Sequence, residues 1–298
     1  MSFLEVRNLA KSFPSPSGVR HVLKDVALDV DQGEFVSIVG TMGSGKSTLL
    51  SLLAGLTSPD AGTVVLDGKP VTGVSGDAAF VFQNYSLLPW FSALENVRLA
   101  VQAAFPDAPA AVQKRRASEA LERVGLGNAL TRRPAQLSGG MRQRVALARA
   151  FATNPRVLFL DDPFGALDAL TRETLQQDLA ELGSQSDRRV TTVMITNSVE
   201  EAILLSDRIV PIVPGPPLDH ARRALSKAER APATLGAAIP VELSRPRSVA
   251  QLAHDEQATH VRAHVIATLT ASPGRLKKPA REMNASSPVL QAVAKEAP

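Results

Sequence analysis

Residues 40–48 read Gly40-Thr41-Met42-Gly43-Ser44-Gly45-Lys46-Ser47-Thr48. The residues just before them, 35–39, form a short apolar run with β character, and residues 49–54 have the composition of a helix start. A glycine-rich loop between a strand and a helix is the setting in which the pattern G-x-x-x-x-G-K-[ST] binds phosphate. The order of the three segments therefore predicts an α/β fold organised around a phosphate-binding loop.

The residue types in this loop explain its chemistry. Gly40, Gly43 and Gly45 can adopt positive φ, so backbone N–H groups can wrap around an anion with no Cβ in the way. The helix that follows adds its positive N-terminal end. Lys46 is placed to reach the β and γ phosphates, and the Ser47 hydroxyl is placed to ligate Mg²⁺. A glycine turn that merely packs tightly is the alternative, but the complete pattern with both flanks favours a loop that binds a nucleoside triphosphate.

The composition narrows the class of protein. The chain has 298 residues, of which 44% are hydrophobic, and it has no cysteine. This is enough for a core in one large domain or two, and it excludes disulfide bonds and thiolate metal sites. No basic region followed by an apolar stretch begins the chain, and no run of about 18 apolar residues occurs, so we expect neither a cleaved export signal nor a membrane span.

The basic charge is concentrated toward the C-terminal end. Residues 1–218 carry 21 Lys and Arg against 22 Asp and Glu, whereas residues 219–298 carry 12 against 7. The latter stretch has no Phe, Tyr or Trp on which bases could stack, which disfavours nucleic acid as a partner. A solvated tail is the simplest interpretation, and weak attraction to an anionic membrane surface or to a partner protein is the alternative.

Two β segments precede the phosphate loop. Residues 3–9 and 22–30 alternate between apolar and polar positions as strands do, and the Pro- and Ser-rich residues 14–18 are predicted to form a loop between them. A small β region is therefore expected in front of the nucleotide core. Phe13 lies beside this loop, where it could stack on an adenine ring or sit half-buried at a strand end, and its position leaves both open.

A long stretch after the phosphate loop, residues 92–151, is predicted to be mainly helical. It begins with the capping-box pattern Ser92-Ala93-Leu94-Glu95, which opens a helix to about residue 104. A second helix is expected at 110–124, and a third opens at Leu137-Ser138-Gly139-Gly140. Ser-Gly-Gly at a helix start offers N–H groups and a hydroxyl, which makes it an anion site in principle.

Polar residues follow two apolar strands. Residues 79–82 lead to Gln83, and residues 157–160 lead to Asp161 and Asp162. Ligands of open parallel sheets bind at the carboxyl ends of the strands. Asp161 is therefore predicted to bind Mg²⁺, and Asp162 to act on the attacking water.

Two more polar residues lie farther along the chain. Asp168 sits in the loop after the acidic pair, before a helix at 172–183. Asn197 follows a buried strand at 190–195, and Ser198 then repeats the capping-box pattern, so its expected role is structural.

In this order and spacing the motifs resemble the ATP-binding subunit of an ABC transporter, over about residues 3–213. The matches are the Walker A loop at 40–47, the Q-loop at Gln83, the LSGGQ-type signature at 137–143, the Walker B strand at 157–161, the D-loop at 166–168 and the H-loop position at Asn197. The resemblance implies a P-loop NTPase of the ABC ATPase fold, with an antiparallel β subdomain, a RecA-like core and a helical subdomain at about 86–151, all within an ATPase domain of residues 1–218.

The resemblance also implies roles for individual residues. Asp162, Asn197 and Gln83 would be catalytic, and Ser47, Gln83 and Asp161 would hold Mg²⁺. The residues that would bind ATP are Phe13, Gly40, Gly43, Ser44, Gly45, Lys46, Ser47, Thr48, Ser138, Gly139, Gly140 and Asp168. Two subunits would pair head to tail, so that the Ser138 corner of one covers the γ-phosphate held by Lys46 of the other.

Finer features resemble one branch of the family. Residues 83–90, 162–172 and 196–202 look like those of importers of nitrate, cyanate, bicarbonate and sulfonates such as taurine, and Asn197 is similar to the nitrate branch. Segments at 215–217 and 240–247 resemble that branch more loosely. The expected protein energises uptake of a small anion, most simply nitrate or nitrite.

The expected partners follow from the same resemblance. They are permease subunits, contacted through the groove between the core and the helical region near residues 83–91, a second ATPase subunit that is the same or different, and indirectly a periplasmic or extracellular solute-binding protein. No nucleic acid is expected, and the chain would sit peripherally on the cytoplasmic face of the membrane. The alternatives are a weakly hydrolysing regulatory subunit and a soluble ABC ATPase outside transport, which a single cassette without a heptad run disfavours.

Two departures from the family pattern bear on turnover. Asp162 stands where most relatives have Glu as the general base, and its side chain is one methylene shorter. Placement errors near 1 Å can cost about a hundredfold in rate. Asn197 replaces the more usual His and can hydrogen-bond a phosphate but cannot titrate. We expect slow hydrolysis unless the backbone moves Asp162 inward.

The C-terminal part has no recognisable chemistry. Residues 219–270 form an extension of uncertain structure, irregular with at most short helices up to about residue 250 and with helical spacing at 249–269. The stretch 249–269 contains three histidines, His254, His260 and His264, and without a nearby acid or cysteine in the pattern a metal site is disfavoured. Residues 271–298 are predicted to be disordered.

Overall fold

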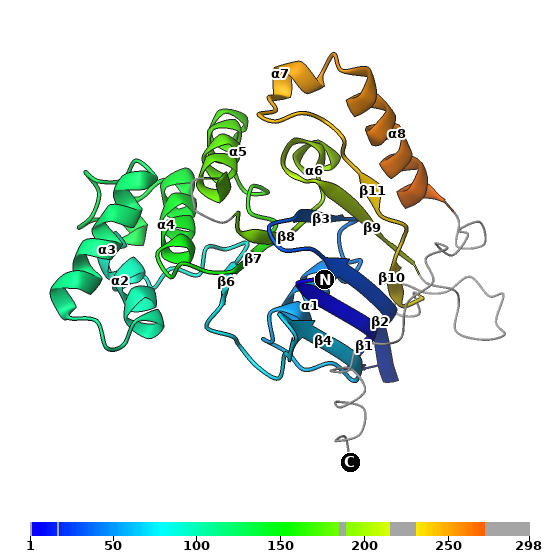
Figure 1. Ribbon diagram of the computed structural model, residues 1–298, viewed down its shortest axis with the longest axis horizontal. Coiled ribbons are helices and arrows are strands. Elements are labelled where there is room, and N and C mark those ends of the chain that lie inside the picture. Colours follow the sequence, from blue (N-terminus) through cyan, green and yellow to red (C-terminus); the bar gives the residue numbers. More distant parts are fainter. Residues whose placement is uncertain (1, 17, 185–188, 215–230, 272–298) are drawn as a thin grey trace. The chain divides into compact units, whose positions relative to one another are not determined.

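The computed structural model describes residues 2–16, 18–184, 189–214 and 231–271 (Figure 1). The chain divides into two compact units. One contains Met1–Ser75 together with Asn197–Pro298, and the other contains Gly76–Thr196. The first unit holds the phosphate loop, and the second holds the predicted signature and the acidic pair.

The first unit is built on a curled sheet. Its strands are β1 (Leu4–Ser15), β2 (Gly18–Val30), β3 (Phe35–Val39), β4 (Ala61–Leu66), β5 (Lys69–Pro70), β9 (Arg208–Pro214), β10 (Ala233–Leu235) and β11 (Ile239–Pro240). They follow the order β5-β4-β1-β2-β10-β9-β3, with β11 also paired to β9. β1 is antiparallel to both of its neighbours, β2 and β4, whereas β3 runs parallel to β9, so an antiparallel layer leads into parallel strands.

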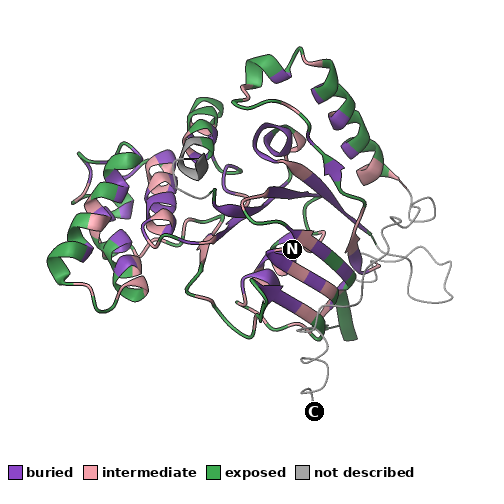
Figure 2. Cartoon of the chain, viewed as in Figure 1, coloured by how far each residue is buried: buried purple, intermediate pink, exposed green. Residues whose placement is uncertain are grey.

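The helices in the described residues of the first unit are α1 (Lys46–Leu53), α6 (Val199–Leu205), α7 (Val249–Leu252) and α8 (Glu256–Thr270). All five residues of β3 are buried, and α1 buries Leu49, Leu50, Leu52 and Leu53 (Figure 2). Because β3 and α1 are both anchored in this core, the loop between them is held at both ends.

In the second unit, the described residues form the parallel strands β6 (Ala78–Val81), β7 (Val157–Asp161) and β8 (Thr191–Thr196), in the order β6-β7-β8. Its helices are α2 (Ala93–Ala104), α3 (Ala110–Arg123), α4 (Gly139–Phe151) and α5 (Ala169–Ser184), with a short 3-10 helix at Pro134–Gln136. The predicted helical stretch is confirmed, and so is the capping box at Ser92.

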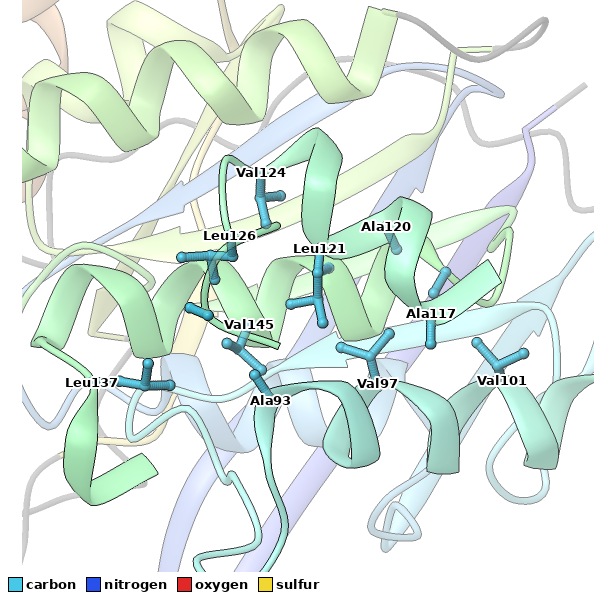
Figure 3. Packing of buried hydrophobic residues seen from close by; sticks show 13 residues of the cluster. Ala93, Val97, Val101, Ala117, Ala120, Leu121, Val124, Leu126, Leu137 and Val145 are labelled. Carbon is cyan, nitrogen blue, oxygen red and sulfur yellow. The ribbon is translucent and has the colours of Figure 1, made fainter. Parts of the chain in front are cut away.

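Helices α2, α3 and α4 enclose their own apolar cluster (Figure 3). Val97 of α2, Leu121 of α3 and Val145 of α4 are each fully buried. The buried residues of the cluster recur along each helix at the spacing of a single apolar stripe, which faces the neighbouring helices. The cluster gives α4, which starts at the predicted signature, a rigid support.

The loop predicted at residues 14–18 needs correction, because most of these residues belong to strands: β1 continues to Ser15 and β2 begins at Gly18. The register pairs Phe13 with Arg20 and Pro14 with Val19. Proline is tolerated at such a strand end because a hairpin tip does not need its missing N–H.

The prediction of irregular structure with at most short helices before residue 250 is also wrong, because β10 and β11 form there. β10 lies between β2 and β9, and β11 pairs with the N-terminal part of β9. Short extensions gain strand structure from an edge that supplies hydrogen-bond partners, which local sequence does not reveal. The helical spacing at 249–269 is confirmed as α7 and α8, and the predicted disordered stretch from 272 onward lies outside the described residues.

An arginine fastens this extension to the first unit. The Arg247 guanidinium donates hydrogen bonds to the carbonyl oxygens of Ile203 at 2.7 Å and Ser206 at 2.6 Å, which terminate α6, and to those of Val241 and Leu243. The last carbonyls of a helix lack partners within it. The extension therefore caps α6, the helix that follows Asn197.

Candidate nucleotide site

The phosphate loop runs from the end of β3 at Val39 to the start of α1 at Lys46. Gly43 has φ 77° and Gly45 has φ 96°, a region that residues with a Cβ rarely adopt. Gly40 is required for a different reason, because a Cβ there would overlap the Ile212 side chain of β9. The glycine pattern therefore reflects backbone shape at two positions and close packing at a third.

Lys46 is the central charge of this loop. Its side chain is buried, and its ammonium donates to the carbonyl oxygens of Gly40 and Thr41, both at 2.8 Å, and to Asn197 Oδ1 at 2.9 Å. Each of these three oxygens belongs to an uncharged group. Hydrogen bonds between an ammonium and an anionic oxygen are roughly twice as strong as neutral ones, so a phosphate oxygen offers Lys46 a better partner than the loop itself does.

The loop also contains a polar group without a partner. Ser44 Oγ is buried and has no hydrogen-bond partner within the described part of the chain. Buried hydroxyls are nearly always satisfied. The N-cap of α1, Gly45, makes no side-chain capping bond, so the first N–H groups of the helix also face the loop without a side-chain cap. Together with Lys46, these groups fit the phosphates of a nucleotide.

The remaining predicted nucleotide residues of the first unit lie on or near exposed surface. Ser47 is exposed on the first turn of α1, and Thr48 follows it half-buried. Phe13 is 39% exposed near the end of β1, with Lys11 Nζ 5.5 Å from the centre of its ring. One face of the Phe13 ring is therefore near the Lys11 ammonium, and the stacking of Phe13 on an adenine stays a prediction.

In the second unit the predicted catalytic side chains Gln83 and Asp162 meet. Gln83 Nε2 donates to Asp162 Oδ2 at 3.1 Å, and the Asp162 N–H donates to the Ile195 carbonyl of β8 at 2.9 Å. Asp162 has φ 43°, a left-handed conformation that Asp tolerates better than most residues. A Cβ at Gly165 would lie 2.5 Å from Asp162 Oδ2, so the loop leaves room for the carboxylate only because residue 165 is glycine.

Asp161 and Asp168 flank this carboxylate in sequence. Asp161 is the last residue of β7, in register with Ile195 of β8. Asp168 Oδ1 accepts the Thr171 N–H at 3.0 Å at the start of α5, and this backbone hydrogen bond lowers the pKa of Asp168. The Asp168 carboxyl is therefore held by its own loop in the described structure.

The signature residues begin α4. Ser138 is its N-cap, and its hydroxyl accepts the Met141 N–H at 3.2 Å. A Cβ on Gly140 would overlap Thr171 Cγ2 of α5, whereas a Cβ on Gly139 would meet its nearest neighbour, Leu167 Cδ2, at an ordinary 3.7 Å. Gly140 is thus needed for packing, whereas a Cβ at Gly139 would make only ordinary contacts.

One residue that the structure brings to this region, Arg149, was not among the residues predicted from the sequence. Arg149 of α4 binds the backbone that follows Gln83. Its position inside the otherwise apolar run 145–150 is the signal that could have found it, because charged residues among buried positions are seldom without partners.

Each unit therefore brings together part of the predicted set. The first joins the loop 40–48 to Asn197, and the second joins Gln83 to Asp162 and the start of α4 to the Asp168 loop. The roles assigned to these residues stay predictions. Among the described residues, no helix is both long and apolar enough to cross a membrane.

Comparison with known proteins places the chain in a family. The model of the family described as ABC transporter matches residues 23–165. The chain is 42% identical over 264 residues to the nitrate import ATP-binding protein NrtD of Synechococcus elongatus, covering 89% of this chain and 90% of that protein. It is 43% identical over 277 residues to the bicarbonate transport ATP-binding protein CmpC of the same organism, where it covers 93% of this chain but spans only 39% of that protein.

A solved structure supports the same placement. An ATP-binding cassette determined as a dimer in a post-hydrolysis state, bound to ADP and Pi, matches with a TM-score of 0.64 and 35% identity over 70% of this chain and 93% of that one. The predicted fold class is confirmed. The chain belongs to the ABC transporter family, within which it forms an ATP-binding cassette.

Proposed function

We propose that this chain is the ATP-binding and ATP-hydrolysing subunit of an importer for a small anion, with nitrate or nitrite first and bicarbonate, cyanate or a sulfonate next. The observation that carries the proposal is the buried Lys46, which donates to the loop carbonyls of Gly40 and Thr41 and to Asn197 Oδ1, in a loop whose Ser44 hydroxyl has no partner among the described residues. The choice of anion is supported by the similarity to NrtD and CmpC, whose names give nitrate and bicarbonate as their cargo.

Binding begins at the phosphate loop. A γ-phosphate oxygen replaces one of the uncharged oxygens around Lys46, and the loop and the first N–H groups of α1 receive the β-phosphate. Asn197 then loses its contact with Lys46, and its amide can present NH₂ to the γ-phosphate instead of Oδ1. The amide NH₂ can donate to phosphate at any pH, whereas a titrating side chain would first have to be protonated.

Ser47, Gln83 and Asp161 are the residues that would hold Mg²⁺, because hydroxyl, amide and carboxylate oxygens are its preferred protein ligands. When bound, Mg²⁺ supplies charge neutralisation at the β and γ phosphates. The protein's part is to hold the oxygens in place.

Asp162 takes the proton of the attacking water in this proposal, and Gln83 orients that water. In the described structure Gln83 Nε2 donates a hydrogen bond to Asp162 Oδ2, and this hydrogen bond must break or shift before that oxygen can accept a proton from water. A second subunit, the same or a related chain, contributes its Ser138, Gly139 and Gly140 to the γ-phosphate, with Asp168 close to the paired surface. Half of the phosphate contacts thus come from the partner.

The proposed subunit acts peripherally at the cytoplasmic face of a membrane, on permease subunits that receive a solute from a binding protein. Residues 83–91 are the proposed contact surface for the permease. Trp90 is 63% exposed there, with Phe91 packed edge-on at a centroid distance of 6.3 Å. Exposed aromatic side chains are common anchors at protein interfaces.

A test measures nucleotide-dependent dimerisation of the purified chain by light scattering, with Mg²⁺ and a non-hydrolysable ATP analogue. Lys46→Ala and Ser138→Ala should both abolish the dimer. Ser248→Ala is the matched control, since Ser248 also N-caps a helix, α7, and its loss removes a cap without touching nucleotide. A chain that stays monomeric with nucleotide, or dimers that survive both substitutions, would overturn the proposal.

The transported solute needs a cellular assay. A deletion strain complemented with this chain should regain uptake of nitrate, scored beside bicarbonate, cyanate and taurine, and the Lys46→Ala chain should not restore it. Restored uptake of a different one of these anions would replace nitrate as the cargo, and no restored uptake of any would contradict the importer proposal.

A second candidate is a nucleotide-binding subunit that hydrolyses weakly and regulates a more active partner. The short Asp162 side chain and its left-handed backbone favour it, because both restrict where the carboxylate can reach. Phosphate release below that of a partner cassette, with normal dimerisation, would support this candidate over the first.

A further inference from the structure

Arg149 lies in the last turn of α4 and reaches the chain segment after Gln83. Its Nη1 donates to the Ser86 carbonyl at 2.7 Å, and its Nη2 donates to the Tyr85 carbonyl at 2.8 Å. The two nitrogens of one guanidinium thus bind two consecutive carbonyl oxygens. A planar fork of this kind fixes direction as well as distance.

The backbone that Arg149 binds is strained. Tyr85 has φ 65° and Ser86 has φ 45°, two consecutive residues with a Cβ in the left-handed region. Such residues persist where the surrounding structure holds them, and they cluster at sites that switch. Burial lowers the pKa of Arg149, but a guanidinium stays charged in proteins, so its hydrogen bonds are charge-assisted.

A second contact joins the same two elements. The Arg142 guanidinium lies 5.9 Å from the centre of the Tyr85 ring. Both arginines belong to α4, the helix that starts at Ser138, and both hold Tyr85, two residues after Gln83. No residue of the predicted catalytic set makes these contacts.

We propose that Arg149 is a positioning residue that latches the Gln83 segment to the signature helix α4, so that Gln83 and Ser138 move as one body. The latch joins two parts of the second unit, the segment whose Gln83 contacts Asp162 and the helix α4, which begins after Ser138. It follows that a displacement of residues 83–91 is passed to α4 and to Asp162 together. This inference rests on the proposed ATPase function, which it deepens.

The chain carries its own probe for this latch. Trp90 is the single tryptophan of the sequence, and it lies in the latched segment. The time-resolved fluorescence anisotropy of Trp90 reports segmental motion on the nanosecond scale. The variants are Arg149→Gln, which loses the charge and the fork, and Arg149→Lys, which keeps the charge but cannot bind both carbonyls in parallel.

The matched control is Arg144→Gln. Arg144 lies on the same helix, is half-buried, and donates to the Val124 carbonyl at 2.7 Å while pairing with Asp178 at 2.9 Å. Its loss removes comparable interactions from α4 without touching residues 83–91. Thermal unfolding of all variants shows which of them remain folded at the assay temperature.

The latch predicts faster anisotropy decay of Trp90 in Arg149→Gln, an intermediate change in Arg149→Lys, and none in Arg144→Gln. Turnover should fall roughly 10- to 100-fold in kcat for Arg149→Gln, in line with a displacement near 1 Å at a reacting group, while KM for ATP stays within about twofold. If the decay is the same in Arg149→Gln, Arg149→Lys and wild type, the latch is wrong. Should the wild type itself release no phosphate, the proposed function fails, and the anisotropy still decides the latch. If Arg149→Gln does not fold, Arg149→Lys decides it.

Discussion

The phosphate loop and the Gln83–Asp162 pair hold their key side chains in opposite ways. Lys46 is buried, and its ammonium donates three hydrogen bonds of 2.8–2.9 Å, two to carbonyl oxygens of the phosphate loop and one to Asn197 Oδ1. Gln83 is exposed, and its hydrogen bond to Asp162 is 3.1 Å long, between residues whose segments include left-handed backbone. One region is preorganised for binding, and the other is held in a conformation that can change.

The difference suggests a division of work. Binding is tightest when its groups are in place before the ligand arrives, because no ordering cost remains to be met. Turnover needs a base that is released at the right moment, so a weak and strained contact suits it better than a rigid one. Four predictions test how far this contrast holds.

The largest effect is expected for Lys46→Gln. Removing the positive charge from the preorganised loop should lower ATP turnover by about 100- to 1000-fold, the range for losing one electrostatic contact to a transition state. Phosphate release and ATP binding by calorimetry would measure it. Lys69→Gln, at an exposed lysine of β5, is the control and should leave both unchanged. Normal ATP binding by Lys46→Gln would break the contrast.

Asp162→Glu tests the changeable region. If the short side chain limits hydrolysis, the longer one should raise phosphate release by up to about a hundredfold. The left-handed φ of 43° works against this gain, because Glu tolerates it less well than Asp. Asp162→Asn keeps the length without the charge and should lose turnover. No gain, or a loss, in Asp162→Glu would show that reach is not the limit.

Gly140→Ala and Gly139→Ala compare neighbouring positions at the start of α4. The first introduces a Cβ that overlaps Thr171 Cγ2, so unfolding should cost about 1–3 kcal/mol less. The second meets ordinary contacts and should leave the stability nearly unchanged. Thermal unfolding measures both. Thr171→Ser removes the opposing methyl and should restore stability to Gly140→Ala, and equal stability of the two alanine variants would contradict the packing argument.

The smallest effect is expected from Asp168, whose carboxyl is exposed. Its folded pKa is lowered by the Thr171 N–H, so the unfolded state binds more protons below about pH 4. The stabilisation of the folded state by the hydrogen bond to the Asp168 carboxylate is present above that pH, and it is lost as the pH falls through the folded pKa of Asp168. Asp168→Asn keeps a capping side chain but cannot titrate, so its thermal stability should vary less between about pH 5 and 2. If the dependence of thermal stability on acid pH is the same in Asp168→Asn and wild type, the Asp168 carboxylate does not contribute to stability in this way.

Local patterns predicted much of the molecule. The loop 40–48, the capping box at Ser92 and the acidic end of β7 are each written in a few adjacent residues. Such signals act over one turn or one strand end, where the backbone and its nearest side chains decide the structure. For this reason the elements and the family were predictable, whereas β10 and β11, which depend on a distant edge, were not.

The amino-acid sequence alone determined the phosphate loop, the order of the strands and helices up to β9, apart from the short β5, and the membership of the chain in its family, because these rest on residue types at short spacing. Only the tertiary structure decided that Lys46 meets Asn197, 151 positions away, that Gln83 meets Asp162, 79 positions away, and that Arg149 holds Tyr85 and Ser86. Those contacts arise from packing between distant segments, and hydrogen bonds at 3 Å depend on where the whole core places each backbone.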